Sequence, residues 1–346
     1  MSPAIETHTI KRTFDGRPAV DGVDLSVAPG EIYGFLGPNG AGKSTMVRML
    51  CTLLAPTSGT AAVLGHDVAK DPNGVRFNIG VALQDAGLDE RQTGREILDI
   101  QGRLYGLNRS EIAQRTTDII SFIDLGEAFD QRVATYSGGM KRRLDLAASL
   151  VHNPQVLFLD EPTTGLDPIS RKKVWDEVRH LNEELGMTVF LTTQYLEEAD
   201  ELADRVGIIS HGKLAVEDTP TALKRQLGND LIVVEVEHAQ MELAESTLAG
   251  LEGTEGVEMR GHELLVGTPN GAALLSPVAI ALGKADLKVL SLTLRTPTLD
   301  DVFVSVTGER LAGDDDDQDD VESEWATPRS APGPAPASQA SVPSWP

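Results

Sequence analysis

The residues best placed for chemistry lie in one short stretch, residues 37–45, which reads Gly-Pro-Asn-Gly-Ala-Gly-Lys-Ser-Thr. An apolar run, residues 32–36, precedes it, and the segment 46–50, Met-Val-Arg-Met-Leu, follows. The stretch fits the pattern G-x-x-x-x-G-K-[ST] in the setting that this pattern requires, a buried strand, a glycine-rich turn and a helix. It therefore predicts a loop that binds the phosphates of a nucleotide.

Each residue type in this loop has a physical role in holding phosphate. Glycine allows backbone conformations that other residues avoid, so that successive N–H groups can point at phosphate oxygens. Lys43 can reach the β- and γ-phosphates, and Ser44 can offer its hydroxyl to Mg²⁺. A glycine-rich turn that binds nothing is disfavoured because strand, lysine and serine occur together. The remaining predicted loop residues are Gly37, Pro38, Asn39, Gly40, Ala41, Gly42 and Thr45.

Two carboxylates follow a second buried strand. Residues 156–159 are all apolar, and Asp160, Glu161 and Pro162 come next. Such a run is typical of a parallel sheet, and ligands bind at the carboxyl ends of its strands. We expect Asp160 to hold Mg²⁺ through water and Glu161 to orient and polarise the water that attacks the γ-phosphate. The alternative, a helix cap by Asp160, is weak because residues 162–165 delay the next helix.

Three further features are ambiguous by themselves. Gln84 follows the apolar strand 79–83 and could reach Mg²⁺ or the attacking water, although a glutamine in a loop means little alone. Ser137 can cap the following helix while two glycines, Gly138 and Gly139, leave its first N–H groups open to an anion, or this is an ordinary capped helix. Phe14 could stack on an adenine or belong to the core.

The elements that position these residues alternate between buried strands and helices, which predicts an α/β fold. The expected strands are 5–11, 23–27, 32–36, 79–83, 156–160, 188–193 and a hairpin of 206–210 with 213–216. The expected helices are 43–54, 141–152, 169–185 and 195–205. Residues 92–135 are helical in pattern, with a capping box at Thr93 and Glu96 and a second helix capped by Ser110. They predict a small helical insertion.

The C-terminal third has a different pattern. A strand at 231–237, a helix at 241–251, strands at 257–260 and 263–266, a helix at 272–282 and a strand at 287–294 give the order βαββαβ. That order predicts a small ferredoxin-like α+β domain. Residues 313–346 hold an acidic run and then six prolines, a composition that does not form a packed core. We therefore predict a disordered tail.

Composition excludes some classes of protein. The chain has 346 residues and a net charge of −23, which argues against nucleic acid as a main ligand because phosphate backbones need a basic surface. A single cysteine, Cys51, allows no intrachain disulfide. Neither a secretion signal nor a run of about 18 apolar residues is present, so we expect a cytosolic chain whose membrane role requires a partner.

Over about residues 4–225 the chain resembles the ATP-binding subunit of ABC transporters, a P-loop NTPase fold. The loop 37–45 resembles Walker A and favours Phe14 as the residue that stacks on adenine. In the same resemblance Gln194 stands at the position of the switch histidine. The other matching motifs are the Q-loop at Gln84, the signature at 136–140, Walker B at 157–161 and the D-loop at 165–167.

Two departures from the usual motifs point to one branch of this family. Tyr136 and Met140 replace the ends of the signature, and Gln194 can donate to a γ-phosphate but cannot carry a proton. With the segments 141–146 and 192–200, these features resemble the daunorubicin/doxorubicin-resistance branch of drug exporters. In that branch the glutamine is a normal variant.

The resemblance implies an ATPase with ATP and Mg²⁺ as ligands that energises export of a drug or hydrophobic natural product, anthracycline-like, and so antibiotic resistance. It implies a separate integral-membrane permease and a peripheral position on the cytoplasmic face of the cell membrane. It also implies a homodimer in which Ser137, Gly138 and Gly139 of one copy close over the ATP of the other. The expected domains are 4–225, with a helical subdomain at about 92–150, then 228–310 and the tail 313–346.

Two alternatives come from other classes. A soluble ABC ATPase of DNA repair or of ribosomes would show a coiled-coil insertion, a second cassette or basic patches, and none is visible in the sequence. A nucleotide-gated regulator with negligible turnover is suggested by Gln194, and steady-state phosphate release separates it from a transporter subunit.

Overall fold

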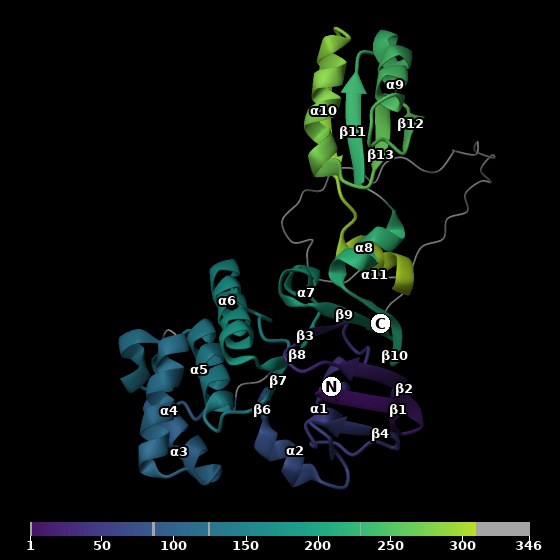
Figure 1. The fold of residues 1–346 in the computed structure, drawn as a ribbon. Helices are drawn as coiled ribbons and strands as arrows, with labels where there is room; N and C mark the ends of the chain where they lie inside the picture. The colour runs from purple at the N-terminus through teal and green to yellow at the C-terminus, as the bar shows by residue number, and fades with distance from the viewer. Residues whose placement is uncertain (1, 85–86, 124, 229, 309–346) are drawn as a thin grey trace, which may run out of the picture. The chain divides into compact units, whose positions relative to one another are not determined.

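The computed structural model describes residues 2–84, 87–123, 125–228 and 230–308 (Figure 1). The predicted disordered tail, residues 313–346, lies outside the described residues.

The chain begins with a four-stranded antiparallel sheet of order β2-β1-β4-β5. β1 and β2 pair from Ile5 opposite Val27 to Phe14 opposite Arg17, so a two-residue turn joins them. Phe14 is therefore the last residue of β1, where its ring is 43% exposed. The strands are β1 (Ile5–Phe14), β2 (Arg17–Val27), β4 (Ser58–Val63) and β5 (His66–Asp67).

A six-stranded sheet of order β10-β9-β3-β8-β7-β6 forms the centre of the nucleotide-binding fold. The five strands from β9 to β6 run parallel, and β10 is antiparallel to β9. The carboxyl ends of β3, β7 and β6 consequently meet at one edge of the sheet. The strands are β3 (Ile32–Leu36), β6 (Ile79–Ala82), β7 (Val156–Asp160), β8 (Thr188–Thr193), β9 (Arg205–Ser210) and β10 (Lys213–Asp218).

Alternate residues of β7 enter two different apolar clusters. Val156 and Phe158 pack with residues of the first sheet and of α1, whereas Leu157 and Leu159 pack with residues of the helical insertion and of α6. This alternation is the two-residue period of a strand covered on both faces. The helices beside the sheet are α1 (Lys43–Leu50), α2 (Pro72–Asn78), α6 (Pro168–Leu185) and α7 (Leu196–Leu202).

The helical insertion forms as expected, with one correction at a helix start. Thr93 and Glu96 make the predicted capping box. The cap of the next helix is Asn108 and not Ser110, because the Asn108 side chain accepts from the N–H groups of residues 110 and 111 while the Glu111 side chain accepts from the Asn108 N–H. The elements, which lie together in Figure 1, are α3 (Gly94–Leu104), α4 (Arg109–Phe122), η1 (Gly126–Asp130), η2 (Val133–Thr135) and α5 (Gly138–Leu150).

The C-terminal third contains a separate antiparallel sheet of order β12-β13-β11-β14. Its strands and the helices α9 and α10 follow the βαββαβ order expected from the sequence, and their apolar side chains form a cluster of their own. The elements are β11 (Asp230–Val236), η3 (His238–Gln240), α9 (Met241–Ala249), β12 (Gly256–Arg260), β13 (Glu263–Thr268), α10 (Gly271–Lys284) and β14 (Val289–Arg295).

Two short helices that the sequence pattern did not predict flank this α+β segment in the sequence. They are α8 (Pro220–Leu227) and α11 (Leu299–Thr307). Leu223 of α8 and Phe303 of α11 are fully buried in one cluster with Leu196 of α7. The last described helix therefore packs beside the helix that directly follows Gln194.

Within the described part of the chain, no helix combines the length and the apolar character that crossing a bilayer requires.

Candidate active site

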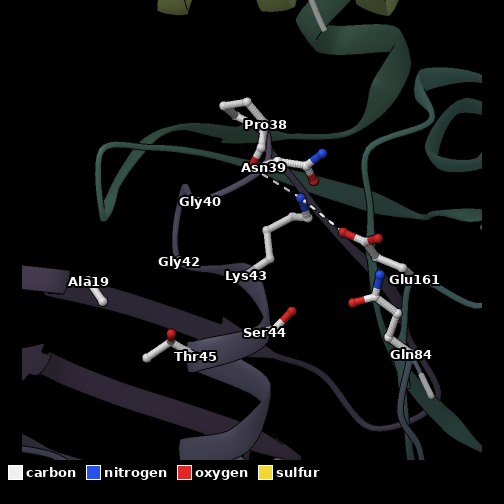
Figure 2. A pocket seen from close by; sticks show the side chains of 10 residues that line it. All are labelled: Ala19, Pro38, Asn39, Gly40, Gly42, Lys43, Ser44, Thr45, Gln84 and Glu161. Atoms are coloured by element: carbon white, nitrogen blue, oxygen red, sulfur yellow. Dashed lines mark hydrogen bonds and ion pairs between the residues drawn. The ribbon is translucent and has the colours of Figure 1, made fainter. Parts of the chain in front are cut away.

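A cavity of about 250 Å³ lies where the carboxyl ends of the parallel strands meet. Figure 2 shows its lining, which comes from the loop between β3 and α1, the start of α1, one residue of β2 and the residues after β6 and β7. The cavity therefore brings together segments that are more than a hundred residues apart. The lining residues are Ala19, Pro38, Asn39, Gly40, Gly42, Lys43, Ser44, Thr45, Gln84 and Glu161.

Two positions in the loop require glycine. A Cβ atom at Gly37 would lie 2.5 Å from the carbonyl oxygen of Ile209, and one at Gly42 would lie 2.3 Å from that of Ala19. Gly42 also has a φ of 112°, in the region that other residues avoid. The loop can consequently run close to β2 and β9 and begin α1 directly after Gly42.

Lys43 is the buried cation of the cavity. Its Nζ donates to the carbonyl oxygens of Gly37 at 2.7 Å and Pro38 at 3.2 Å, and it lies 3.3 Å from Oε1 of Glu161. The side chains of Lys43 and Glu161 are only 4% and 7% exposed. Burial lowers the pKa of Lys43, and the adjacent Glu161 carboxylate opposes this effect. The dashed lines in Figure 2 mark the contacts of Lys43 with Pro38 and Glu161. The lysine places one positive charge where a phosphate would bind.

Ser44 and Asp160 form a pair of oxygen groups beside the lysine. The Ser44 hydroxyl donates to Oδ1 of Asp160 at 3.1 Å, and the Thr192 hydroxyl of β8 donates to the same oxygen at 2.6 Å. Thr192 is opposite Asp160 in the parallel pairing of β7 with β8. Hydroxyl and carboxylate oxygens are ligands that Mg²⁺ prefers, so Ser44 and Asp160 fit the metal of a nucleotide complex.

The backbone of Glu161 has an unusual conformation. Its φ is 49°, in the left-handed region that non-glycine residues seldom adopt. Its N–H donates to the carbonyl oxygen of Thr192 at 3.0 Å, and its Oε2 accepts from the Thr164 hydroxyl at 3.3 Å. Such a conformation costs about 1–3 kcal/mol and persists where surrounding contacts hold it. Here the turned backbone directs the carboxylate into the cavity, next to Gln84 (Figure 2).

The structure brings together only part of the predicted site. Among the residues that the structure describes, the predicted site residues that do not line the cavity are Phe14, Gly37, Ala41, Asp160, Gln194 and the segment 137–139. Gly37 and Asp160 lie next to it, since they accept from Lys43 and Ser44. Phe14 lies at the end of β1 under the guanidinium of Arg12, which is 4.6 Å from its ring centroid. Ser137 caps α5 as predicted, since its hydroxyl accepts from the Met140 N–H at 3.3 Å.

Sequence reasoning missed three polar residues around this edge of the sheet. Thr192 lies inside an apolar strand, and its contact with Asp160 depends on a strand register that the sequence does not specify. Glu198 of α7 is fully buried and accepts from the Thr163 hydroxyl and the Trp175 indole N–H, both at 2.9 Å. Arg142 of α5 is also buried. For Glu198 and Arg142, the sequence offered one indication of burial: each is a charged residue at a helix position where an apolar residue is expected.

The fold and the cavity define a P-loop ATPase, and comparison with known proteins agrees. The sequence profile of the family described as ABC transporter matches residues 20–164. Relatives with longer matches cover close to nine tenths of the chain. The chain therefore belongs to the ABC transporter ATP-binding family, and it is an ATPase of that type.

Similar curated proteins are named for drug resistance. The daunorubicin/doxorubicin resistance ATP-binding protein DrrA of Streptomyces peucetius is 46% identical over 310 residues, which cover 88% of this chain and 92% of that protein. The linearmycin resistance ATP-binding protein LnrL of Bacillus subtilis (strain 168) is 34% identical over 312 residues, which cover 89% and 99%. This chain is thus similar to the drug-resistance branch expected from its motifs.

A solved structure supports the fold. The dimeric post-hydrolysis state of the ATP-binding cassette MJ0796 bound to ADP and Pi matches with a TM-score of 0.56 and 25% identity. The match covers 62% of this chain and 98% of that chain. Because almost all of that cassette matches less than two thirds of this chain, this chain has a nucleotide-binding fold and additional structure.

Proposed function

We propose that this chain hydrolyses ATP to energise export of a drug or hydrophobic natural product through a separate membrane permease. The observation that carries the proposal is the cavity lined by Lys43, Ser44 and Glu161, with Asp160 hydrogen-bonded to Ser44 at its edge. The names of the similar proteins, which refer to resistance to daunorubicin, doxorubicin and linearmycin, support the export role.

The proposed roles follow from where the groups lie. The loop amides and Lys43 hold the terminal phosphates, and Ser44 with Asp160 would hold Mg²⁺. When bound, this ion neutralises charge on the phosphates. Glu161 orients and polarises the attacking water, with Gln84 beside it. Phe14 and Gln194 do not line the cavity, and their roles rest on the family: Phe14 would provide a ring for adenine, and Gln194, which follows β8, would reach the γ-phosphate.

The segment 137–139 supports a homodimer. It opens α5 with N–H groups suited to an anion, yet it does not line the described cavity of its own chain. A second copy that places this segment over the γ-phosphate would complete two equivalent sites. The dimeric cassette among the similar structures supports this arrangement.

An exposed apolar surface beside β6, the strand that leads to Gln84, supports a permease partner. Phe77 of α2 and Leu104 of α3 are 61% and 74% exposed. Near them a cavity of about 330 Å³ has Leu53, Val81 and Tyr105 among its lining residues. Apolar side chains gathered at one exposed place indicate a protein contact. We propose that the permease binds here, which places the chain at the cytoplasmic face of the membrane.

The change Glu161→Gln tests the proposed function. We expect the purified variant to bind ATP and to release no phosphate, because an amide cannot act as a base toward water. Glu184→Gln, the same change at an exposed residue of α6, should leave turnover unchanged. Full turnover by Glu161→Gln would refute the role given to Glu161.

The export role needs a second measurement. We expect co-expression with its proposed membrane permease to lower cellular accumulation of an anthracycline, and we expect Glu161→Gln to abolish that effect. ATP turnover without any effect on accumulation would favour a soluble ATPase. Negligible phosphate release by the wild-type chain would favour the nucleotide-gated regulator that Gln194 suggests.

A further inference from the structure

Arg142 of α5 is a charged residue in a buried position. Its side chain is only 9% exposed, and α5 begins at the capping residue Ser137, five positions earlier. A buried guanidinium is costly unless its N–H groups are paired. The partners of Arg142 therefore show what this residue does.

The guanidinium donates to three backbone carbonyls at the catalytic edge of the sheet. Nε donates to the carbonyl oxygen of Pro162 at 2.9 Å, and Nη2 donates to that of Asp160 at 3.2 Å. Nη1 donates to the carbonyl oxygen of Leu83. Asp160 and Pro162 are the two neighbours of Glu161, and Leu83 directly precedes Gln84.

We infer that Arg142 is a positioning residue that fixes the backbone of Glu161 and of Gln84 relative to each other and to α5. The inference deepens the proposed function and rests on the roles proposed there for Glu161 and Gln84. Neither residue contacts Arg142 through its own side chain in the contacts described, so Arg142 acts through the backbone that carries them.

The chemistry of arginine suits this task. Its planar guanidinium has five N–H donors in a fixed arrangement, so one side chain can pair with carbonyls from two strands. A lysine ammonium is a single point of charge and cannot reproduce that geometry. The strained φ of Glu161, 49°, is therefore held between two carbonyls that Arg142 fixes.

Asp145, three residues along α5, balances the charge. Its Oδ2 lies 3.4 Å from Nη1 of Arg142, and its side chain is largely buried. Burial raises the pKa of Asp145 to about 6, and the guanidinium opposes this shift. Because α5 also carries the segment 137–139 at its start, the contacts of Arg142 join that helix to the edge where hydrolysis is proposed.

A double variant separates positioning from stability. Arg142→Gln with Asp145→Asn removes both charges, keeps polar side chains and leaves at most two N–H donors for three carbonyls. We expect its kcat to fall about 10- to 100-fold, because small displacements of catalytic groups have effects of this size. The Kd for ATP should stay near the wild-type value, since Lys43 and its loop do not contact Arg142. Circular dichroism should show a folded protein, although one carbonyl without a donor will lower the Tm somewhat.

Two single variants are matched controls. Asp145→Asn keeps the arginine and its three carbonyl contacts, so its kcat should stay close to that of the wild type. Arg142→Lys keeps the charge and loses the planar donors, so its kcat should fall as in the double variant. The effect of Arg142→Lys should also shrink on a Gln84→Ala background, because residues that act as a unit are not additive.

The results of the Arg142 variants and of Glu161→Gln test different claims and can be told apart. Wild-type kcat in the double variant or in Arg142→Lys would overturn the inference. A fall in ATP binding that parallels loss of folded protein in both would also overturn it, because that pattern indicates a structural role alone. Full turnover by Glu161→Gln would instead refute the proposed catalytic role, whatever the Arg142 variants do.

Discussion

At the residue scale, the carboxylate of Glu161 has two competing partners, Lys43 and the proposed attacking water. It lies 3.3 Å from Lys43 in a nearly buried ion pair, and it is also the group proposed to act on water. Before ATP binds, the lysine is therefore shared between Glu161 and the carbonyls of the loop. A phosphate that enters the cavity must compete with these groups for Lys43.

This competition predicts the effect of Glu161→Gln on affinity as well as on turnover. Removing the carboxylate leaves Lys43 without its charged neighbour, so phosphate becomes the favoured partner. We expect the variant to bind ATP a few-fold more tightly than the wild type in equilibrium dialysis at protein concentrations too low for dimers. Weaker binding would show that Glu161 does not compete for Lys43.

Phe14 gives a second prediction at this scale. If its ring stacks on adenine, Phe14→Ala should weaken ATP binding by about 1–3 kcal/mol, the usual range for loss of an aromatic–base stack. Binding of inorganic tripolyphosphate, which has no base, should not change. Phe77→Ala, at an exposed phenylalanine outside the cavity, is the control. Equal weakening for both ligands would argue against base stacking.

Asp145 predicts a dependence of stability on pH. Its pKa is raised by burial from 3.8 to about 6, so the folded state binds a proton more tightly than the unfolded state. The stabilisation from this group is present below pH 4 and is lost as pH rises through 6. Relative to Asp145→Asn, the wild-type free energy of unfolding should fall by up to about 3 kcal/mol between pH 4 and 7. Parallel curves for the two proteins would contradict the raised pKa.

The sequence predicts the residues of this site better than their contacts. Lys43, Ser44, Asp160 and Glu161 could be identified because each follows a buried strand in a recognisable pattern. Thr192 and Arg142 could not, because their partners are set by strand register and by the packing of α5 against two strand ends. The left-handed backbone of Glu161 also has no signal in the residue types around it.

At the scale of elements, the packing of α11 has consequences for the rest of the fold. Phe303 is fully buried against residues of α7 and α8, and α7 directly follows Gln194. Phe303→Ala should lower the free energy of unfolding by about 3–5 kcal/mol through loss of burial and creation of a cavity. Chemical denaturation measures this change. Val306→Ala, at an exposed position of α11, should have little effect, and similar losses for the two variants would contradict the packing.

The elements differ in how far the sequence determines them. β7 and β8 could be predicted because continuous apolar runs have few alternatives in a parallel sheet. The start of α4 was wrong by two residues, since both Asn108 and Ser110 are good caps and only the reciprocal contact with Glu111 favours Asn108. α8 and α11 were missed because a helix of eight or nine residues shows little periodicity and depends on tertiary packing.

At the scale of the whole molecule, the proposed dimer can be tested through Gly138. A Cβ atom there would have its nearest neighbour, Leu166 Cδ2, at 3.9 Å, so a substitution does not disturb the chain itself. Glu161→Gln with Mg²⁺ and ATP should sediment as a dimer. Adding Gly138→Asp should keep it monomeric, because the new carboxylate repels the γ-phosphate of the partner site. A dimer that forms equally well with Gly138→Asp would contradict the proposed arrangement.

The central claim is that the cavity at the end of β3 binds ATP through Lys43, and equilibrium dialysis of purified protein tests it most directly. With Mg²⁺ present, the wild-type chain should retain ATP, and a Lys43→Ala variant that is folded by circular dichroism should retain almost none. Equal retention of ATP by a folded Lys43→Ala variant, or none by the wild-type chain, would contradict the account.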